Sequence, residues 1–420
     1  MADEPGAGLV PADFRLGLAW TGWEAEGGFN GPGQPADNRV RWAPTARAGP
    51  RWRVGDFWQQ PQPTLDRAAA MGCTAFGLSV EWARLEPAEG RFDAAALDRY
   101  GDVLAMCRRR GLAPVVTLHH GTHPWWLGEE FWLTPGAPDR FAAHVARVVD
   151  RLAGGCDRWV TVDRPDLLAW AGWLSGQAPP GRRGALSDAW AVVDNLLTAH
   201  VLAFEALTAA QPDGQVAIGT GSSARYDDGP LLVDLLCARS LGVDRAALDD
   251  WVDERRAAHD LAVPPRHLAD LAARRLVAAA CPFGRGAGPV RGRLRRPSPR
   301  RVVRAVYDAT SPRPLGAVLV DAADPAAFAG RCRELQALVP GLPLWATGAG
   351  SPADVGRQLR AVVAAVDGGV PLHAYLCRGP GGAADPSAGG RFATYGRLLA
   401  AVRDGDAAAL GALVAGRRAC

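Results

Sequence analysis

The chain has 420 residues, of which 48% are apolar, and its formal net charge is +3. The apolar content is enough to bury a large core, and so small a net charge at this length argues against a general nucleic-acid or membrane-surface binder. Two or three domains could form from this length, but (β/α) barrels of this size fold as one unit.

The N-terminal segment and the cysteines bear on the compartment. Residues 1–10 carry acidic residues but no basic region and no long apolar run, which predicts that there is no signal peptide. No window of the sequence approaches the apolar length of a bilayer-spanning helix. We therefore expect a cytoplasmic protein without a membrane partner. Its eight cysteines lack CxxC or Cys/His spacing, which favours reduced thiols over disulfides or a zinc site.

Short apolar runs of β type recur along the chain, and segments with helical periodicity lie between them. Strands are predicted at residues 14–20, 75–80, 113–120, 158–163, 215–220, 316–322, 343–348 and 371–377. Helices are predicted at residues 92–111, 139–154, 185–211, 328–339 and 353–369. Strands that are apolar on nearly every residue are typical of parallel sheets covered on both faces. The alternation predicts an α/β fold, a single (β/α)8 TIM barrel.

The barrel is expected to occupy residues 14–405, between an N-terminal tail at 1–13 and a C-terminal tail at 406–420. The basic run GRGAGPVRGRLRRPSPRRVVR at 284–304 is interpreted as a solvated loop, and no nucleic-acid partner is expected. A second glycine-rich stretch, at 379–390, follows the last predicted strand.

The C-terminal ends of the strands are the expected place for chemistry, because parallel barrels carry their functional side chains there. These ends are Trp20–Glu24, Glu81-Trp82, His119-His120, Asp163-Arg164, Asp321–Ala323, Thr347–Ala349 and Cys377-Arg378. Acids, imidazoles and indoles together are typical of a carbohydrate site, in which polar groups bond hydroxyls and aromatic faces support sugar rings.

Several motifs follow one another in an order that points to a known family. They are FRLGLAWTGWEAEG (14–27), LSVEWARLEPAEGRFD (78–93), PVVTLHHGTHPWWL (114–127), GQAPPG (176–181) and PGLPLWATGAG (340–350). Together they resemble glycoside hydrolase family 1, the β-glucosidase family of retaining enzymes on a (β/α)8 barrel, over roughly residues 14–400. The resemblance implies that His120 contacts the glycon, and that Glu24 stands where the family has a glycon-binding Gln.

The catalytic positions implied by the resemblance do not carry the family's residues. The acid/base lies in T-F/L-N-E-P, and this chain reads TVDRP at 161–165; the nucleophile lies in T-E-N-G, and this chain reads TGAG at 347–350. Arg164 and Gly348 therefore occupy the two catalytic positions. Arginine does not release its proton and glycine has no side chain, so ordinary retaining β-glucosidase turnover is not expected.

Asp163, Glu24 and His120 are the candidates for replacement chemistry. By resemblance, Asp163 and Glu24 each put a carboxylate where the family has an amide, so the two could form a new acid/base pair. The alternative for Asp163 is an ion pair with Arg164 or Arg378. The alternative for Glu24 is a hydrogen bond to backbone amides or an indole.

A ligand pocket is expected at the barrel mouth. The predicted ligand-binding residues are Glu24, Trp82, His119, His120, Trp125, Trp126 and Asp163. The HPWW run at 123–126 is the candidate platform for a sugar ring or a flat polycyclic compound. Glu81 is interpreted as a strand-end acid in an ion pair.

Three functional hypotheses stay open. The first is a barrel that binds a small-molecule glycoside or a related ligand, or acts as an accessory protein, without hydrolysing O-glycosyl bonds. The second is an enzyme with altered chemistry, such as an inverting hydrolase, lyase, isomerase or cyclase. The third is a residual β-glycosidase that uses loop acids such as Glu129, Glu130 or Asp385. The sequence contains no cofactor or metal-binding motif and does not determine the oligomeric state.

Overall fold

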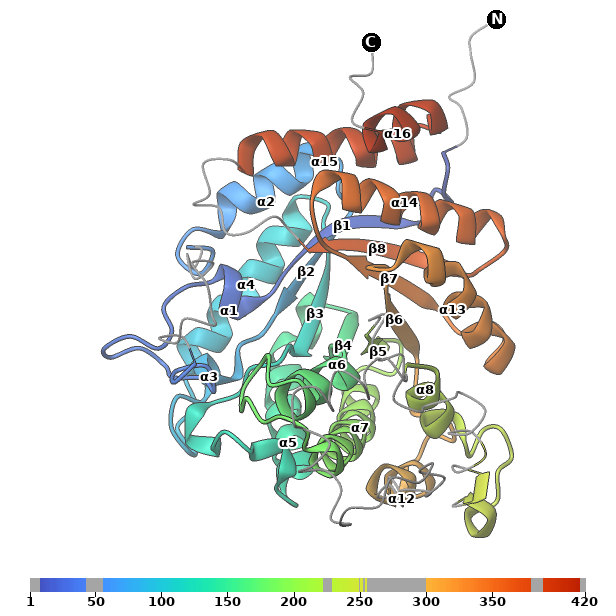
Figure 1. Ribbon diagram of the computed structural model, residues 1–420. Coiled ribbons are helices and arrows are strands. Elements are labelled where there is room, and N and C mark those ends of the chain that lie inside the picture. The colour runs from blue at the N-terminus through green and yellow to red at the C-terminus, as the bar shows by residue number, and fades with distance from the viewer. Residues whose placement is uncertain are drawn as a thin grey trace, which may run out of the picture.

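The computed structural model describes residues 8–42, 56–221, 229–248, 250–251, 254, 300–378 and 388–415. Within these ranges eight parallel strands close into a barrel in the order β1 to β8 (Figure 1). The strands are β1 (Arg15–Trp20), β2 (Ala75–Ser79), β3 (Ala113–His119), β4 (Arg158–Val162), β5 (Gln215–Thr220), β6 (Ala317–Asp321), β7 (Leu344–Gly348) and β8 (Leu372–Arg378). Each predicted strand is present at its expected place, which confirms the single (β/α)8 barrel.

Helices surround the barrel (Figure 1). The longer ones are α2 (Pro61–Ala70), α4 (Ala94–Arg109), α5 (Ala137–Leu152), α7 (Leu186–Ala210), α8 (Gly229–Cys237), α12 (Arg300–Asp308), α13 (Pro325–Leu338), α14 (Pro352–Asp367), α15 (Ala388–Arg403) and α16 (Ala407–Val414). Short helices after β1, β2 and β4 are α1 (Gly22–Ala25), α3 (Trp82–Leu85) and α6 (Pro165–Ala169). Single turns of 3₁₀ or π type occur at Trp125–Leu127, Phe131–Leu133, Ala153–Gly155, Trp170–Leu174 and Arg245–Ala247.

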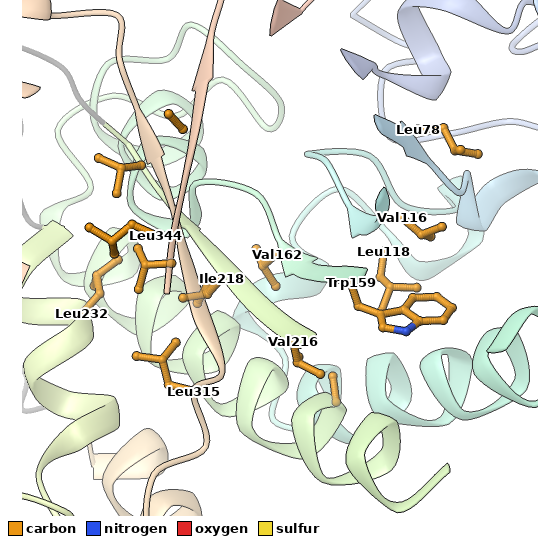
Figure 2. Packing of buried hydrophobic residues seen from close by; sticks show 14 of the residues in the cluster. Leu78, Val116, Leu118, Trp159, Val162, Val216, Ile218, Leu232, Leu315 and Leu344 are labelled. Carbon is orange, nitrogen blue, oxygen red and sulfur yellow. The ribbon is translucent and has the colours of Figure 1, made fainter. Parts of the chain in front are cut away.

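The two faces of the barrel wall pack into separate cores. A small cluster with residues from β2 to β8 fills the interior, and most of its members are Ala, Val or Leu around one large side chain, Trp345. The larger cluster joins the outer faces of the strands to the helices. Figure 2 shows part of it, including Leu118, Trp159 and Val216 from the neighbouring strands β3, β4 and β5. Since both faces are buried, most residues of the strands are apolar.

Helix α7 corrects one expectation. Its 25 residues include a window long and apolar enough to cross a membrane, so the prediction that no segment approaches that length is wrong. In this fold 67% of that window is buried inside the molecule, where α7 packs against α5 and α12. The strong apolar character of α7 therefore matches a helix that is covered by its neighbours.

The ends of the chain differ from the expected tails. In the segment 406–420, residues 407–414 form α16, and Leu410 on this helix is buried; residues 416–420 lie outside the described residues. At the other end, the backbone N–H of Leu9 donates to the carbonyl of Val402 at 2.9 Å. Both terminal segments therefore contact the helical layer.

Two predicted loops and two of the cysteines lie partly or wholly outside the described residues. Of the basic run, 284–299 is not described and the remainder begins α12; of the glycine-rich stretch, 379–387 is not described. The cysteines that the structure describes, Cys73, Cys107, Cys156, Cys237, Cys332 and Cys377, are buried free thiols.

Candidate functional site at the barrel mouth

A charged cluster lies where β3, β4, β6 and β8 end. Its centre is Asp163, which directly follows β4. One carboxylate oxygen of Asp163, Oδ2, lies 2.8 Å from Nδ1 of His120, 3.3 Å from Nε of Arg164 and 3.7 Å from Nη1 of Arg378. The ion pair predicted for Asp163 with Arg164 or Arg378 is therefore confirmed, and His120 joins it.

Asp321, at the end of β6, is the second anion of the cluster. Its Oδ2 accepts hydrogen bonds from Arg164 at 3.2 Å and from Arg378 at 3.3 Å, while its Oδ1 accepts from the backbone N–H of Ala323 at 2.9 Å. Each guanidinium thus contacts both carboxylates, and the cluster ties β4, β6 and β8 together across the mouth.

The anions of this cluster are more deeply buried than its donors. The side chains of Asp163 and Asp321 are 4% and 3% exposed, whereas those of Arg164, Arg378 and His120 are 19%, 15% and 14% exposed. A ligand that enters the mouth would therefore meet N–H groups before carboxylate oxygens.

The charges fix the protonation of the cluster. Burial by itself would raise the pKa of Asp163, but Arg164, His120 and Arg378 outweigh it and hold this pKa well below its usual range. Burial by itself would lower the pKa of Arg164, but the carboxylates of Asp163, Asp321 and Asp166 raise it above its usual value. Asp163 is therefore an anion and Arg164 a cation at every physiological pH.

The backbone at Arg164 is left-handed, with φ of 52° and ψ of 64°, which is uncommon for a residue with a side chain. Arg164 is the residue before α6, and Pro165 occupies the first turn of that helix. This conformation costs about 1 kcal/mol or more and persists only where surrounding contacts hold it. The two carboxylates of the cluster provide such contacts.

Gly348, at the end of β7, has no room for a side chain. An added Cβ would overlap Oε1 of Gln358 and lie 2.8 Å from the hydroxyl oxygen of Tyr375. These two side chains are bonded to each other, because Tyr375 donates to Gln358 at 2.8 Å, and the amide of Gln358 donates to the carbonyl of Ala349 at 2.9 Å. A hydrogen-bonded Gln–Tyr pair fills the space beside the strand.

Glu24 is not part of the charged cluster. It lies exposed in the first turn of α1, and its carboxylate accepts a hydrogen bond from the hydroxyl of Thr21 at 2.5 Å. No hydrogen bond or ion pair among the described residues links it to Asp163 or His120. The partner is a neighbouring hydroxyl instead of the backbone amide or indole that the sequence suggested, and an acid/base pair of Glu24 with Asp163 stays a prediction.

The structure places His119 and Trp82 in a packed aromatic layer. Trp82 stacks on His144 with ring centroids 4.6 Å apart, and the ring of His119 meets Trp132 edge-on at 5.0 Å. Burial, together with nearby His123, holds the pKa of His119 far below its usual value. Both side chains are almost fully buried, so a ligand contact by either would require this layer to open.

Trp125 and Trp126 lie on the half-buried loop after β3. The indole N–H of Trp126 donates to the carbonyl of Glu86 at 2.8 Å. Arg41 lies over the ring of Trp125 at 4.7 Å, and Arg140 lies over that of Trp126 at 5.2 Å. The structure thus keeps both indoles at the surface, each covered on one side by a guanidinium.

Glu81, at the end of β2, forms hydrogen bonds instead of the ion pair that was predicted for it. It accepts hydrogen bonds from the backbone N–H of Trp23 at 2.9 Å and from the hydroxyl of Thr122 at 2.7 Å, with no ion pair in the part of the chain that the structure describes. Burial, reinforced by the nearby charge of Glu26, raises the pKa of Glu81 to about 8. Its carboxyl group therefore holds a proton at neutral pH.

Asp321 is the cluster residue to which the sequence analysis gave no role. It was noted only as a strand end, and its partners Arg164 and Arg378 lie 157 and 57 residues away in the chain. The one available signal was an acid at the end of an apolar strand, opposite other charged strand ends in a closed barrel. Among the described residues, no three His, Cys, Asp or Glu side chains are arranged to hold a metal ion.

Comparisons with known proteins give one consistent family. Residues 7–244 match the sequence profile of Glycosyl hydrolase family 1. Human Klotho is 28% identical over 247 residues, which cover 51% of this chain and 24% of Klotho. The 6-phospho-beta-galactosidase of Lacticaseibacillus casei is 26% identical over 214 residues, which cover 50% of this chain and 44% of that enzyme. The chain thus matches less than half the length of these relatives.

Solved structures share the architecture over most of the chain. The family 1 β-glucosidase from Thermotoga maritima superposes with a TM-score of 0.65 at 16% identity and covers 89% of both chains. A β-glucosidase from Exiguobacterium marinum gives 0.64 at 16% identity and covers 87% of this chain and 88% of its own. At such identities the likeness establishes the fold, including the β6–β8 half that the sequence profile does not reach.

We expect Gly348→Ala to lower the free energy of unfolding by about 1–3 kcal/mol, because the new methyl group must displace Gln358. In a Gln358→Ala background the same substitution should cost less, since the obstructing amide is gone. Urea unfolding of the four proteins in this double-mutant cycle measures the coupling.

The control for this cycle is Gly330→Ala on α13, where an added Cβ meets nothing within 4 Å. It should be neutral or stabilising, because alanine is the better helix former. Equal losses from Gly348→Ala with and without Gln358 would show that the amide does not fill this space.

Glu81→Gln should make the fold more stable at alkaline pH. Folding raises the pKa of the Glu81 carboxyl from 4.5 to about 8. Below pH 4.5 the carboxyl is protonated in both the folded and the unfolded chain, so it carries no penalty in folding free energy. The penalty grows as pH rises through the interval and is complete above pH 8, with a slope of at most about 1.4 kcal/mol per pH unit. The glutamine, which imitates the protonated acid, should match the parent at pH 4 and exceed it at pH 8.5. Denaturant unfolding at both pH values tests this, and a gain of equal size at both would contradict it.

Proposed function

Because the chain belongs to glycosyl hydrolase family 1, we propose that it binds a small glycoside-type ligand at the C-terminal mouth of its barrel without retaining hydrolysis. This proposal rests on the residues found at the ends of two strands, β4 and β7. Arg164 stands at the first with its charge fixed by carboxylates, and Gly348 stands at the second with no space for a side chain.

Retaining hydrolysis requires two carboxyl groups about 5–5.5 Å apart, one to protonate the leaving oxygen and one to attack the anomeric carbon. The raised pKa of Arg164 prevents it from acting as the acid. Asp163, whose pKa is far below the usual range, holds no proton to donate and is a weak base. No group in this cluster can perform either step of the retaining mechanism.

Binding is supported by the outward donors of the cluster. Each guanidinium has five N–H groups, and only one from Arg164 and one from Arg378 make hydrogen bonds to described residues, both to Asp321. Arg164 Nε and Arg378 Nη1 also face Asp163, and the other N–H groups of these partly exposed side chains can donate to hydroxyl, ring or carboxylate oxygens of a ligand. The buried carboxylates hold the two guanidinium groups in place for this purpose.

The 2.8 Å contact between His120 and Asp163 favours one alternative, an enzyme with altered acid/base chemistry. The carboxylate accepts the proton of Nδ1 and so orients the ring with Nε2 as an acceptor. No hydrogen bond from the described residues reaches Nε2. A substrate proton at this nitrogen would give His120 the part of a general base.

The protein should show no turnover of 4-nitrophenyl β-glycosides above the uncatalysed rate. A mechanism-based 2-fluoroglycoside should leave the intact mass of the protein unchanged, because no nucleophile is available. Calorimetric titration with the same panel of aryl glycosides should reveal binding that Arg378→Gln weakens about tenfold, as expected for a lost hydrogen bond to a charged group. Robust release of nitrophenol that disappears in Asp163→Asn would overturn the proposal.

The alternative makes a separate prediction for His120→Asn. If the His–Asp pair does acid/base work, any product that mass spectrometry detects from a glycoside panel should fall at least about 100-fold in this variant. Binding of the same glycoside should change by far less, because Arg164 and Arg378 stay in place. Equal loss of binding and turnover would mark His120 as a binding group only.

A further inference from the structure

A cavity of about 770 Å³ lies on the flank of the barrel and shares no residue with the charged cluster at the mouth. Its walls come from the loop at 33–36, the segment just before α2, the loop after α3 and the first turns of α4. This volume is within the range of small-molecule sites, roughly 300–1,000 Å³.

The charged residues of the wall are three arginines and one aspartate, and two of the arginines have no anionic partner among the described residues. The aspartate, Asp93, is used as the N-cap of α4, where its side chain accepts from Ala96 N–H at 2.9 Å. Arg84 is paired with Glu26 at 3.0 Å. The guanidinium of Arg99 donates only to backbone carbonyls, and Arg91 makes no side-chain hydrogen bond or ion pair with the described residues.

Other features of the cavity wall bear on a ligand that carries a negatively charged group next to a ring. Ala95 and Ala96, in the first turn of the 16-residue helix α4, line the cavity, and the Asp93 carboxylate caps this end of the helix. Trp58, half-buried on the opposite segment, presents an aromatic surface that Arg84 holds in place from 4.0 Å. Positive charge and an indole thus occur in the same enclosure.

We propose that this cavity binds a small phosphate monoester that carries an aromatic or sugar ring. A phosphate monoester has about −1.5 to −2 charges near pH 7, so its oxygens can bond both Arg91 and Arg99, and the three arginines of the wall outnumber the single carboxylate of Asp93. Guanidinium groups bond phosphate oxygens in a bidentate manner. The ring of the ligand lies against Trp58. The site is independent of the mouth and does not rest on the function proposed for it.

The test is calorimetric titration of the full chain with phenyl phosphate. Saturable binding is expected, with a dissociation constant that Arg91→Gln and Arg99→Gln each raise about tenfold. Arg91 is exposed, so its variant should keep the parent melting temperature. The matched control, Arg360→Gln, removes an exposed arginine on α14, far from this cavity in the chain, and should leave the binding unchanged.

Further ligands separate the contributions of anion and ring. Inorganic phosphate should bind more weakly than phenyl phosphate, and benzoate should bind more weakly because it carries one charge. Trp58→Leu should reduce the preference for phenyl phosphate over inorganic phosphate. The proposal fails if phenyl phosphate does not bind at about 10 mM, or if Arg91→Gln and Arg360→Gln bind it equally.

Discussion

A buried carboxylate, Asp163, can stay ionised at the mouth of this barrel only because cationic side chains lie beside it. Removing a carboxylate from water costs several kcal/mol, and an isolated buried acid would take up a proton instead. Arg164, His120 and Arg378 prevent this at Asp163, and the same two arginines also contact Asp321. Removal of any one member would leave an uncompensated charge in a poorly hydrated place, so the cluster is constrained as a unit.

The contrast between Asp163 and Glu81 shows how far the surroundings decide the chemistry of an acid. Both follow barrel strands and both are buried, yet their pKa values move in opposite directions. Asp163 has guanidinium neighbours, which favour its charged form. Burial of Glu81 and a second acid, Glu26, nearby favour its protonated form, and they outweigh the two hydrogen bonds that Glu81 accepts from neutral donors. A residue list of acids at strand ends would not distinguish the two.

The packing of the barrel does not depend on the residues at its mouth. Strand closure and helix packing depend on apolar side chains away from the mouth, such as the interior layer around Trp345 and the outer layer around Trp159. Neither layer needs a particular residue at 164 or 348. A family scaffold can therefore carry different groups at its strand ends, and function must be argued from those groups.

The order and place of the strands could be predicted from the sequence because they depend on local patterns, such as the apolar run at 113–120 and the turn residues that follow it. The arginine and glycine at the two expected catalytic positions were also visible in the sequence. The pairing of Asp163 with His120 and the two arginines required the closed barrel, which brings the ends of β3, β4, β6 and β8 to one place.

The tertiary structure also decided between neighbours that the sequence could not separate. His119 and His120 are adjacent, so in an extended segment their side chains face opposite ways, and only the register of the barrel sends His120 to Asp163 and His119 into the aromatic layer. Glu24 and Glu26 differ likewise, since only Glu26 meets a buried arginine. Local periodicity thus determined the elements, while contacts between distant segments determined which side chains share a site, because those contacts exist only after the sheet has closed.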